Sequence, residues 1–186
     1  IGKDTRRSSY MFENALSAGL TASGADAYLM HVTTTPSVSY IVRSDDFDCG
    51  IMISASHNPY TDNGIKLLNS AGEKMEQSVI DEIENYLDGN LEIPFATGAN
   101  IGRTQDYSAG RNRYIGYLIS LSTHSYKGMK VGLDCANGST WMIAKSVFDA
   151  LGADTYVIGN KPDGLNINVE CGSTHLEALQ SLVREN

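Results

Sequence analysis

Hydrophobic and polar positions in the first part of the chain alternate between helical spacing and short apolar runs. A helix is expected after Ser8 or Ser9, either of which can serve as its N-cap, and Gly24 should end it. The apolar face of this helix consists of Phe12, Ala15, Leu16 and Leu20. The next segments read as strand, helix and strand, with expected bounds of Ala27 to His31, Pro36 to Arg43 and Cys49 to Ser54.

The following stretch begins with a polar loop and then returns to regular structure. Residues 55–64 contain Asn-Pro and Asn-Gly turn signals, and residues 65–68 resume an extended pattern. A helix is expected from Glu76 to Leu87, and its apolar face should pack on the sheet. That face is formed by Val79, Ile80, Ile83, Tyr86 and Leu87. Residues 89–110 lack periodicity, so we interpret them as a connecting segment.

The remaining residues repeat the alternation of helices and strands. Helices are expected from Asn112 to Leu121 and from Leu176 to Arg184, with a strand from Val131 to Asp134. Between them, a helix that Gly152 should end carries Ile143, Val147 and Leu151 at four-residue spacing.

The two halves of the chain echo each other. Residues 1–4 (IGKD) resemble residues 131–134 (VGLD), and residues 24–30 (GADAYLM) resemble residues 152–158 (GADTYVI). Because the two offsets are nearly equal, one strand–helix–strand unit appears twice. The sequence therefore predicts two tandem, related three-layer α/β domains with mixed sheets, one over residues 1–110 and the other over residues 111–186.

Both domains are expected to be incomplete. The chain opens with Ile1 in a strand-like segment rather than with Met, so we interpret it as a piece of a larger gene product whose first domain lacks its N-terminal part. The second copy reaches no counterpart of the strand at residues 49–54, so it should lack its C-terminal part. We expect the chain by itself to be inactive.

Charge and cysteine content narrow the classes of function. With 14 Lys and Arg against 22 Asp and Glu, the net charge of −8 argues against nucleic-acid binding. The cysteines, at positions 49, 135 and 171, form no C-x-x-C pair and suit a reducing compartment better than a disulfide scaffold or zinc site. The chain has no apolar run long enough for a membrane span and no signal pattern, which predicts a cytoplasmic protein that does not bind membranes.

The loop after residue 54 is the strongest candidate for chemistry. In an open α/β sheet, ligands bind at the carboxyl ends of strands, where this loop is expected to lie. Its sequence is SASHNPYTDNGIK over residues 54–66, which gathers the Ser56 hydroxyl, the His57 imidazole and the Lys66 ammonium. Such groups could hold a phosphoryl group. An Asn-Pro turn that merely ends a strand is the alternative, and from the pattern alone both stay open.

This loop resembles the active-site signature of the α-D-phosphohexomutase superfamily. The resemblance extends to GKDTR at residues 2–6, TTP at 34–36, TGANIG at 97–102, DCANGS at 134–139, and GLNIN with CGSTH at 164–168 and 171–175. Within the superfamily these segments are most similar to bacterial phosphoglucosamine mutases, with phosphomannomutases and phosphoglucomutases as rivals. The resemblance implies an enzyme that interconverts glucosamine 6-phosphate and glucosamine 1-phosphate, a step in amino-sugar nucleotide and peptidoglycan precursor synthesis.

The resemblance also implies roles for individual residues. Ser56 would be the phosphoserine, and His57 and Lys66 would lie beside the transferring group as catalytic residues. The residues expected to shape the phosphate environment are Arg6, Asn58 and Asn63. Mg²⁺ would bind Ser56 through its phosphate, with aspartate ligands outside this chain, and glucosamine 1,6-bisphosphate would be the intermediate.

The sequence also leads to expectations about binding partners and about alternative functions. The partner is a small sugar phosphate, and the full-length enzyme would act alone or as a homodimer. A non-catalytic α/β binding module, in which the loop is a turn or an inert anion site, is the alternative from another class. A nucleotide-dependent kinase is disfavoured because the sequence has no G-x-x-x-x-G-K-[ST] loop.

Overall fold

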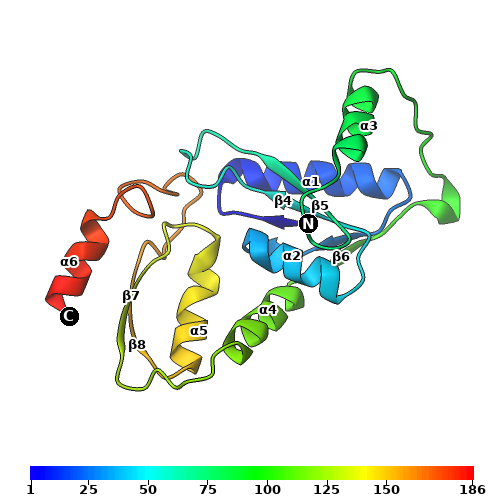
Figure 1. Ribbon diagram of the computed structural model, residues 1–186. Helices are drawn as coiled ribbons and strands as arrows, with labels where there is room; N and C mark the ends of the chain where they lie inside the picture. The colour runs from blue at the N-terminus through cyan, green and yellow to red at the C-terminus, as the bar shows by residue number, and fades with distance from the viewer.

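The computed structural model describes residues 1–186 as an α/β protein (Figure 1). Its first half contains β1 (Gly2–Lys3), α1 (Arg7–Ala22), β2 (Ala27–Leu29), β3 (His31–Val32), α2 (Thr35–Ser44), β4 (Cys49–Ile53), β5 (Ile65–Asn69) and α3 (Gln77–Leu87). The second half contains the 3₁₀ helix η1 (Gly98–Asn100), β6 (Thr104–Asp106), α4 (Ala109–Ser120), β7 (Lys130–Asp134), the 3₁₀ helix η2 (Ser139–Met142), α5 (Ala144–Ala150), β8 (Asp154–Ile158) and α6 (Glu177–Glu185).

The main sheet has the strand order β3-β1-β4-β5. The first three strands are parallel, and β5 runs antiparallel to β4 with Met52 opposite Lys66. Two separate parallel pairs, β2 with β6 and β7 with β8, complete the strands. The predicted α/β class with a mixed sheet is confirmed.

Helices α1 and α2 cover opposite faces of the main sheet. Neighbouring residues of β1 point to opposite sides: a Cβ on Gly2 would lie 2.4 Å from a methyl group of Val38 in α2, whereas Lys3 pairs with Glu13 in α1. Glycine at position 2 therefore lets α2 approach the sheet closely.

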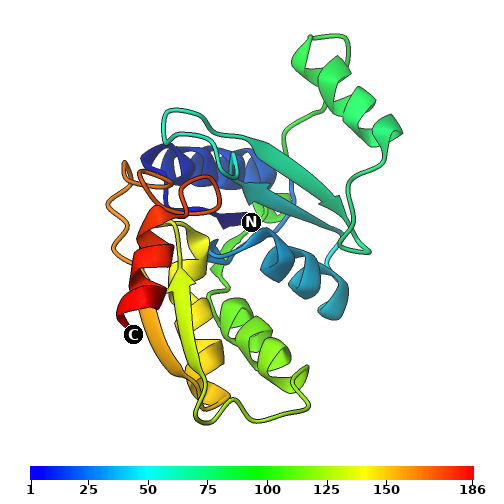
Figure 2. The same cartoon turned by 60° about the vertical axis from the view of Figure 1, so that its left-hand side comes forward.

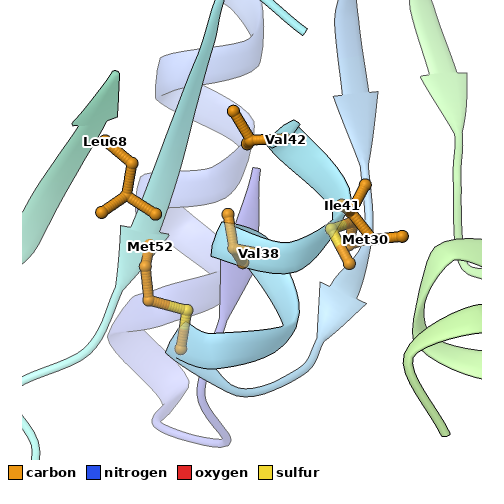
Figure 3. Packing of buried hydrophobic residues seen from close by; sticks show 6 residues of the cluster. All are labelled: Met30, Val38, Ile41, Val42, Met52 and Leu68. Carbon is orange, nitrogen blue, oxygen red and sulfur yellow. The ribbon is translucent and has the colours of Figure 1, made fainter. Parts of the chain in front are cut away.

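The apolar core lies between α2 and the sheet. Figure 3 shows Val38 and Val42 of α2 facing Met52 of β4 and Leu68 of β5, with Met30 beside Ile41. The α2 helix forms where the sequence predicted it, because the Thr34 hydroxyl accepts the Ser37 N–H as an N-cap and Pro36 occupies the first turn.

The buried face of α1 is polar, which corrects the predicted packing. Ser9, Glu13 and Ser17 are buried, whereas Ala15 is exposed and the side chains expected to be buried with it, Phe12, Leu16 and Leu20, are only partly covered. The Ser9 hydroxyl donates to Asp4 at 2.7 Å, Glu13 binds Lys3, and the hydroxyls of Ser17 and Thr104 lie 2.9 Å apart. The helix begins at Arg7 without a side-chain cap, so the expected caps at Ser8 and Ser9 are also wrong.

The buried ion pair between Lys3 and Glu13 yields a stability prediction. Lys3→Met should lower the free energy of unfolding by about 2–3 kcal/mol, because it leaves the buried Glu13 carboxylate without its paired ammonium; the half-exposed His31, 3.2 Å away, and the Ile1 amino group would offset only part of that charge. The double variant Lys3→Met/Glu13→Leu should recover most of that loss in urea denaturation. Lys127→Met, at an exposed lysine without an ion pair, is the control. Equal midpoints for Lys3→Met and Lys127→Met would contradict the prediction.

The predicted strand from Ala27 to His31 is divided into two. Ile1 pairs across from Leu29, since its amino group donates to the Tyr28 carbonyl and its carbonyl accepts the Met30 N–H, but Gly2 already pairs with His31. One extra residue is therefore accommodated here, with His31 in a left-handed conformation at φ +57°. The first part, β2, pairs with β6 instead.

Helix α3 does not pack on the sheet as predicted. None of its side chains is buried, and Val79, Ile83, Tyr86 and Leu87 are exposed. Both views show α3 standing clear of the sheet beyond its β5 edge (Figures 1 and 2). The periodicity predicted the helix and its apolar face correctly, but it carries no information on what that face contacts.

The connecting segment at residues 89–110 contains more structure than predicted, because η1 and the three-residue strand β6 lie within it. Such short elements carry no periodic signal. Further on, α4 begins three residues before its predicted start, and the predicted helix around residue 147 is divided into η2 and α5, with Ile143 and Val147 buried. No helix combines the length and the apolarity needed to cross a bilayer.

The echo between the halves corresponds to similar local structure. In both units, a strand, a helix and a second strand parallel to the first follow one another: β1, α1 and β2–β3 in the first, and β7, α5 and β8 in the second. The register of the strand pairs differs. Val131 lies opposite Thr155, and the echo aligns Thr155 with Ala27. Ile1, the counterpart of Val131, nevertheless lies opposite Leu29, two residues further along. The division into domains 1–110 and 111–186 stays a prediction.

Candidate functional site

The serine loop, residues 54–64, leaves the carboxyl end of β4 and returns into β5. The residues after β1 lie at the same edge, because β1 and β4 are parallel neighbours. Ser56 is exposed and left-handed, with φ +56°, and its hydroxyl makes no hydrogen bond within the protein. The loop therefore presents a free hydroxyl at the edge of the sheet where ligands of α/β proteins bind.

The backbone around Ser56 is held from two sides. The Ser56 N–H donates to the Ser54 hydroxyl at 3.1 Å. The Ser56 carbonyl accepts from Arg6 Nη2 at 3.2 Å and from Asn168 Nδ2 at 3.0 Å. The same two nitrogens donate to the Asn58 carbonyl, at 2.6 and 3.0 Å respectively.

Arg6 is fully buried and holds the serine loop through hydrogen bonds to its backbone. Besides the two loop carbonyls, its guanidinium binds the Asp4 carboxylate, and its backbone N–H donates to the same carboxylate at 3.0 Å. Sequence analysis placed Arg6 in the phosphate environment. The structure brings it to the backbone of the serine loop, and direct contact with a phosphate stays a prediction.

The other predicted site residues are distributed around the loop. His57 is exposed, while the Asn58 amide donates to Asp62 at 3.0 Å within the loop. The Asn63 amide donates to the hydroxyls of Ser8 and Ser9, both at 2.9 Å, and so ties the loop to the start of α1. Lys66 lies on β5, exposed and without a hydrogen bond or ion pair.

A cavity of about 420 Å³ opens beside Ser56 and His57. Its remaining lining comes from the second half of the chain: Asp134, Ala136, Asn168, Gly172, Ser173, Leu176 and Leu179. Sequence analysis assigned no site role to these residues, although all of them except Leu176 and Leu179 lie in segments that carried the resemblance. No local pattern could reveal that an asparagine more than 100 residues away contacts the serine loop.

Asp4 and Asp134, which occupy corresponding places in the two repeated units, brace similar turns. Each carboxylate accepts the backbone N–H of the residue two positions later, from Arg6 at 3.0 Å and from Ala136 at 2.8 Å. Asp134 also accepts the Gly172 N–H at 2.6 Å. Gly172 has φ +84°, and a Cβ there would lie 2.8 Å from that of Ala136, so this close approach requires glycine.

The donor set beside Ser56 does not by itself fit Mg²⁺. Asp134 contributes the one carboxylate among the lining residues, and two backbone N–H groups already bind it. No group of three or more His, Cys, Asp or Glu side chains in residues 1–186 could hold a metal ion. Magnesium prefers several oxygen ligands in octahedral geometry, so these residues alone provide too few.

The three cysteines form no disulfide. Cys135 and Cys171 are buried near the cavity, and burial raises the pKa of both thiols. They therefore stay protonated at neutral pH and are poor nucleophiles.

Comparison with known proteins identifies the family. Residues 1–93 match the family model for the α/β/α domain I of phosphoglucomutase/phosphomannomutase. The structure superposes with a TM-score of 0.77 on a phosphoglucomutase/phosphomannomutase family protein from Burkholderia thailandensis, at 21% identity, covering 99% of this chain and 40% of that one. The chain belongs to the phosphoglucomutase/phosphomannomutase family.

Within this family, the chain is similar to phosphoglucosamine mutases. It is 73% identical over 185 residues to the phosphoglucosamine mutase of Lachnospira eligens. It is 70% identical over 186 residues to the phosphoglucosamine mutase of Lachnoclostridium phytofermentans. These matches cover 99% and 100% of this chain. The chain spans only 41% and 42% of the length of these relatives.

Proposed function

We propose that this chain is the phosphoserine-bearing part of a phosphoglucosamine mutase, which interconverts glucosamine 6-phosphate and glucosamine 1-phosphate. The observation that carries the proposal is the free, exposed hydroxyl of Ser56 on a rigidly held loop beside a cavity of about 420 Å³. The high identity to phosphoglucosamine mutases supports glucosamine as the sugar.

The proposed reaction has two balanced halves. In the first, the bond between phosphorus and Ser56 Oγ breaks while a bond to the free sugar hydroxyl forms; the proton of that hydroxyl passes to a base, and Ser56 Oγ takes up a proton. The product, glucosamine 1,6-bisphosphate, reorients in the site. In the second half, the Ser56 hydroxyl gives its proton to a base and its Oγ accepts the other phosphoryl group, while the released sugar oxygen takes up a proton.

The residues of this chain take the following proposed roles. His57 is a candidate proton-transfer group because it is exposed on the cavity next to Ser56. Lys66, exposed and unpaired, offers a positive charge to the phosphoryl group. Arg6, Asn58 and Asn63 shape the loop through the bonds described above. Mg²⁺ is proposed as the cofactor of the full-length enzyme, with most of its ligands outside residues 1–186.

Domain organisation follows from the same proposal. Residues 1–110 would form the first domain and residues 111–186 part of the second, and the chain alone would not turn over substrate because the rest of the site is supplied elsewhere in the enzyme. Free thiols and a sugar-phosphate substrate suit a cytoplasmic enzyme. The full-length enzyme would be a monomer or a homodimer.

Mass spectrometry of the full-length protein tests the proposal. Incubation with glucosamine 1,6-bisphosphate should add one phosphate, which peptide mapping assigns to Ser56, and Ser56→Ala should gain none. Ser173→Ala, which removes another hydroxyl from the same cavity, should still gain one. Equal labelling of the Ser56→Ala protein would overturn the proposal. Labelling by mannose or glucose bisphosphate, but not by glucosamine bisphosphate, would shift it to the phosphomannomutase or phosphoglucomutase reaction.

A further inference from the structure

Ser56 occupies a backbone conformation that needs support. A non-glycine residue in the left-handed region costs about 1–2 kcal/mol, and it persists only where neighbouring groups hold it. At Ser56 these groups are Ser54, which accepts its N–H, and Arg6 and Asn168, which both donate to its carbonyl. Together they occupy every hydrogen-bonding position of the Ser56 backbone and leave only the hydroxyl free.

Arg6 and Asn168 reach the loop from different parts of the chain. Arg6 follows β1, within the unit that carries the loop, whereas Asn168 lies between β8 and α6. The Asn168 amide donates 3.0 Å bonds to both the Ser56 and Asn58 carbonyls, so it bridges the two ends of the turn that carries His57. This bridge is the contact through which the second half of the chain grips the serine loop.

Asn168 is itself fixed in place. Its backbone is left-handed, with φ +61°, and its N–H donates to the Ala136 carbonyl at 2.9 Å. Ala136 is anchored in turn, because its own N–H donates to Asp134 at the end of β7. Asparagine suits this position for two reasons: it tolerates the left-handed region, and its short amide supplies two N–H groups.

We propose that Asn168 is a positioning residue for phosphoryl transfer at Ser56. This inference rests on the proposed function. Asn168 acts through the backbone of the serine loop and orients the Ser56 oxygen toward the cavity that both residues line. Without its two bonds, Arg6 would be the only side chain that donates to the two carbonyls of the turn, and the Ser56 oxygen would sample directions unsuited to in-line transfer. Misplacement of a reacting atom by about 1 Å can cost roughly 100-fold in rate.

Two variants of the full-length protein test this role. Asn168→Gly keeps the left-handed backbone accessible but removes the bridge, and it should lower kcat by about 10- to 100-fold with KM changed less than about twofold. Glu170→Gly is the matched control: it is a left-handed, exposed neighbour whose side chain makes no hydrogen bond, and its kcat should be unchanged.

Asn168→Asp adds a readout that a purely structural role would not move. Its carboxylate would repel the two carbonyl oxygens, so this variant should be slower than Asn168→Gly at about pH 8. As the pH falls toward about 5.5, a protonated carboxyl can donate again, and the difference between the two variants should shrink or reverse. The rate of each variant is divided by its own rate at about pH 8 before the two pH profiles are compared. A constant loss of active protein in one variant therefore does not affect the result.

The outcomes separate the two claims. If unsubstituted protein carries phosphate on Ser56 but Asn168→Gly retains normal kcat, the role of Asn168 is wrong and the proposed function stands. A parallel pH profile for Asn168→Asp and Asn168→Gly also argues against the bridge. If the unsubstituted protein never carries phosphate on Ser56, the proposed function and this inference both fail.

Discussion

Replacement of Ser56 by alanine should reduce mutase turnover of the full-length protein by about 10⁴-fold or more. The reason is that Ser56 offers the only free serine hydroxyl of the serine loop at the cavity, whereas Ser173, the other serine of the cavity lining, lies between β8 and α6. The Ser54 hydroxyl already accepts the Ser56 N–H, and the neighbouring thiols of Cys135 and Cys171 are buried. A coupled assay for glucosamine 1-phosphate formation measures the effect.

The control for this experiment is Ser70→Ala, which removes an exposed hydroxyl from the turn after β5. It should leave turnover within about twofold of the unsubstituted enzyme, since isolated surface substitutions rarely matter. Turnover by Ser56→Ala close to that of Ser70→Ala would mean that another group carries the phosphate.

Replacement of Arg6 by methionine should lower the free energy of unfolding by about 3–5 kcal/mol. Methionine fills a similar space, but it leaves the Asp4 carboxylate buried without its counter-ion and withdraws one donor from each of two loop carbonyls. Arg6→Lys should be intermediate, because an ammonium is a point charge that cannot reach the carboxylate and both carbonyls at once. Urea denaturation followed by circular dichroism measures the loss.

Arg7→Met provides a matched comparison for Arg6. Arg7 is the next residue, exposed and without an ion pair, so its replacement should change the free energy of unfolding by less than about 0.5 kcal/mol. Arg6→Met/Asp4→Asn should be less destabilised than Arg6→Met, because it removes the unpaired charge. If Arg6→Met and Arg7→Met unfold at the same urea concentration, the buried guanidinium is not the support that the structure indicates.

Sequence patterns predicted the local elements well because local spacing determines them. The apolar run at residues 49–53 and the Thr-Pro start of α2 specify their elements without reference to the rest of the chain. The placement of Ser56 in a loop at the carboxyl end of a strand is confirmed for the same reason. The roles assigned to Ser56, His57 and Lys66 stay predictions, because geometry alone does not demonstrate chemistry.

Features that depend on contacts between residues far apart in the chain could not be predicted from the sequence. The burial of Glu13 rather than Phe12 follows from Lys3 lying opposite it in β1, and periodicity rules treat charged residues as exposed. Asn168 was similarly invisible, because its contact with Ser56 spans 112 positions. The exposure of α3 was missed for the opposite reason: an apolar face is read as buried even where nothing lies against it.

The polar face of α1 acts as a ruler along the helix axis. Ser9, Glu13 and Ser17 each meet a different partner, and their spacing spreads these contacts over about 12 Å. A helix that packs through an apolar face can shift along its axis by one turn, since one methyl group can replace another in the contact. Here a slip would set Glu13 against Asp4 or Thr104 instead of Lys3, so only one axial setting satisfies all three contacts. That setting also fixes where α1 starts, and with it the hydroxyls of Ser8 and Ser9 to which the serine loop is fastened through Asn63.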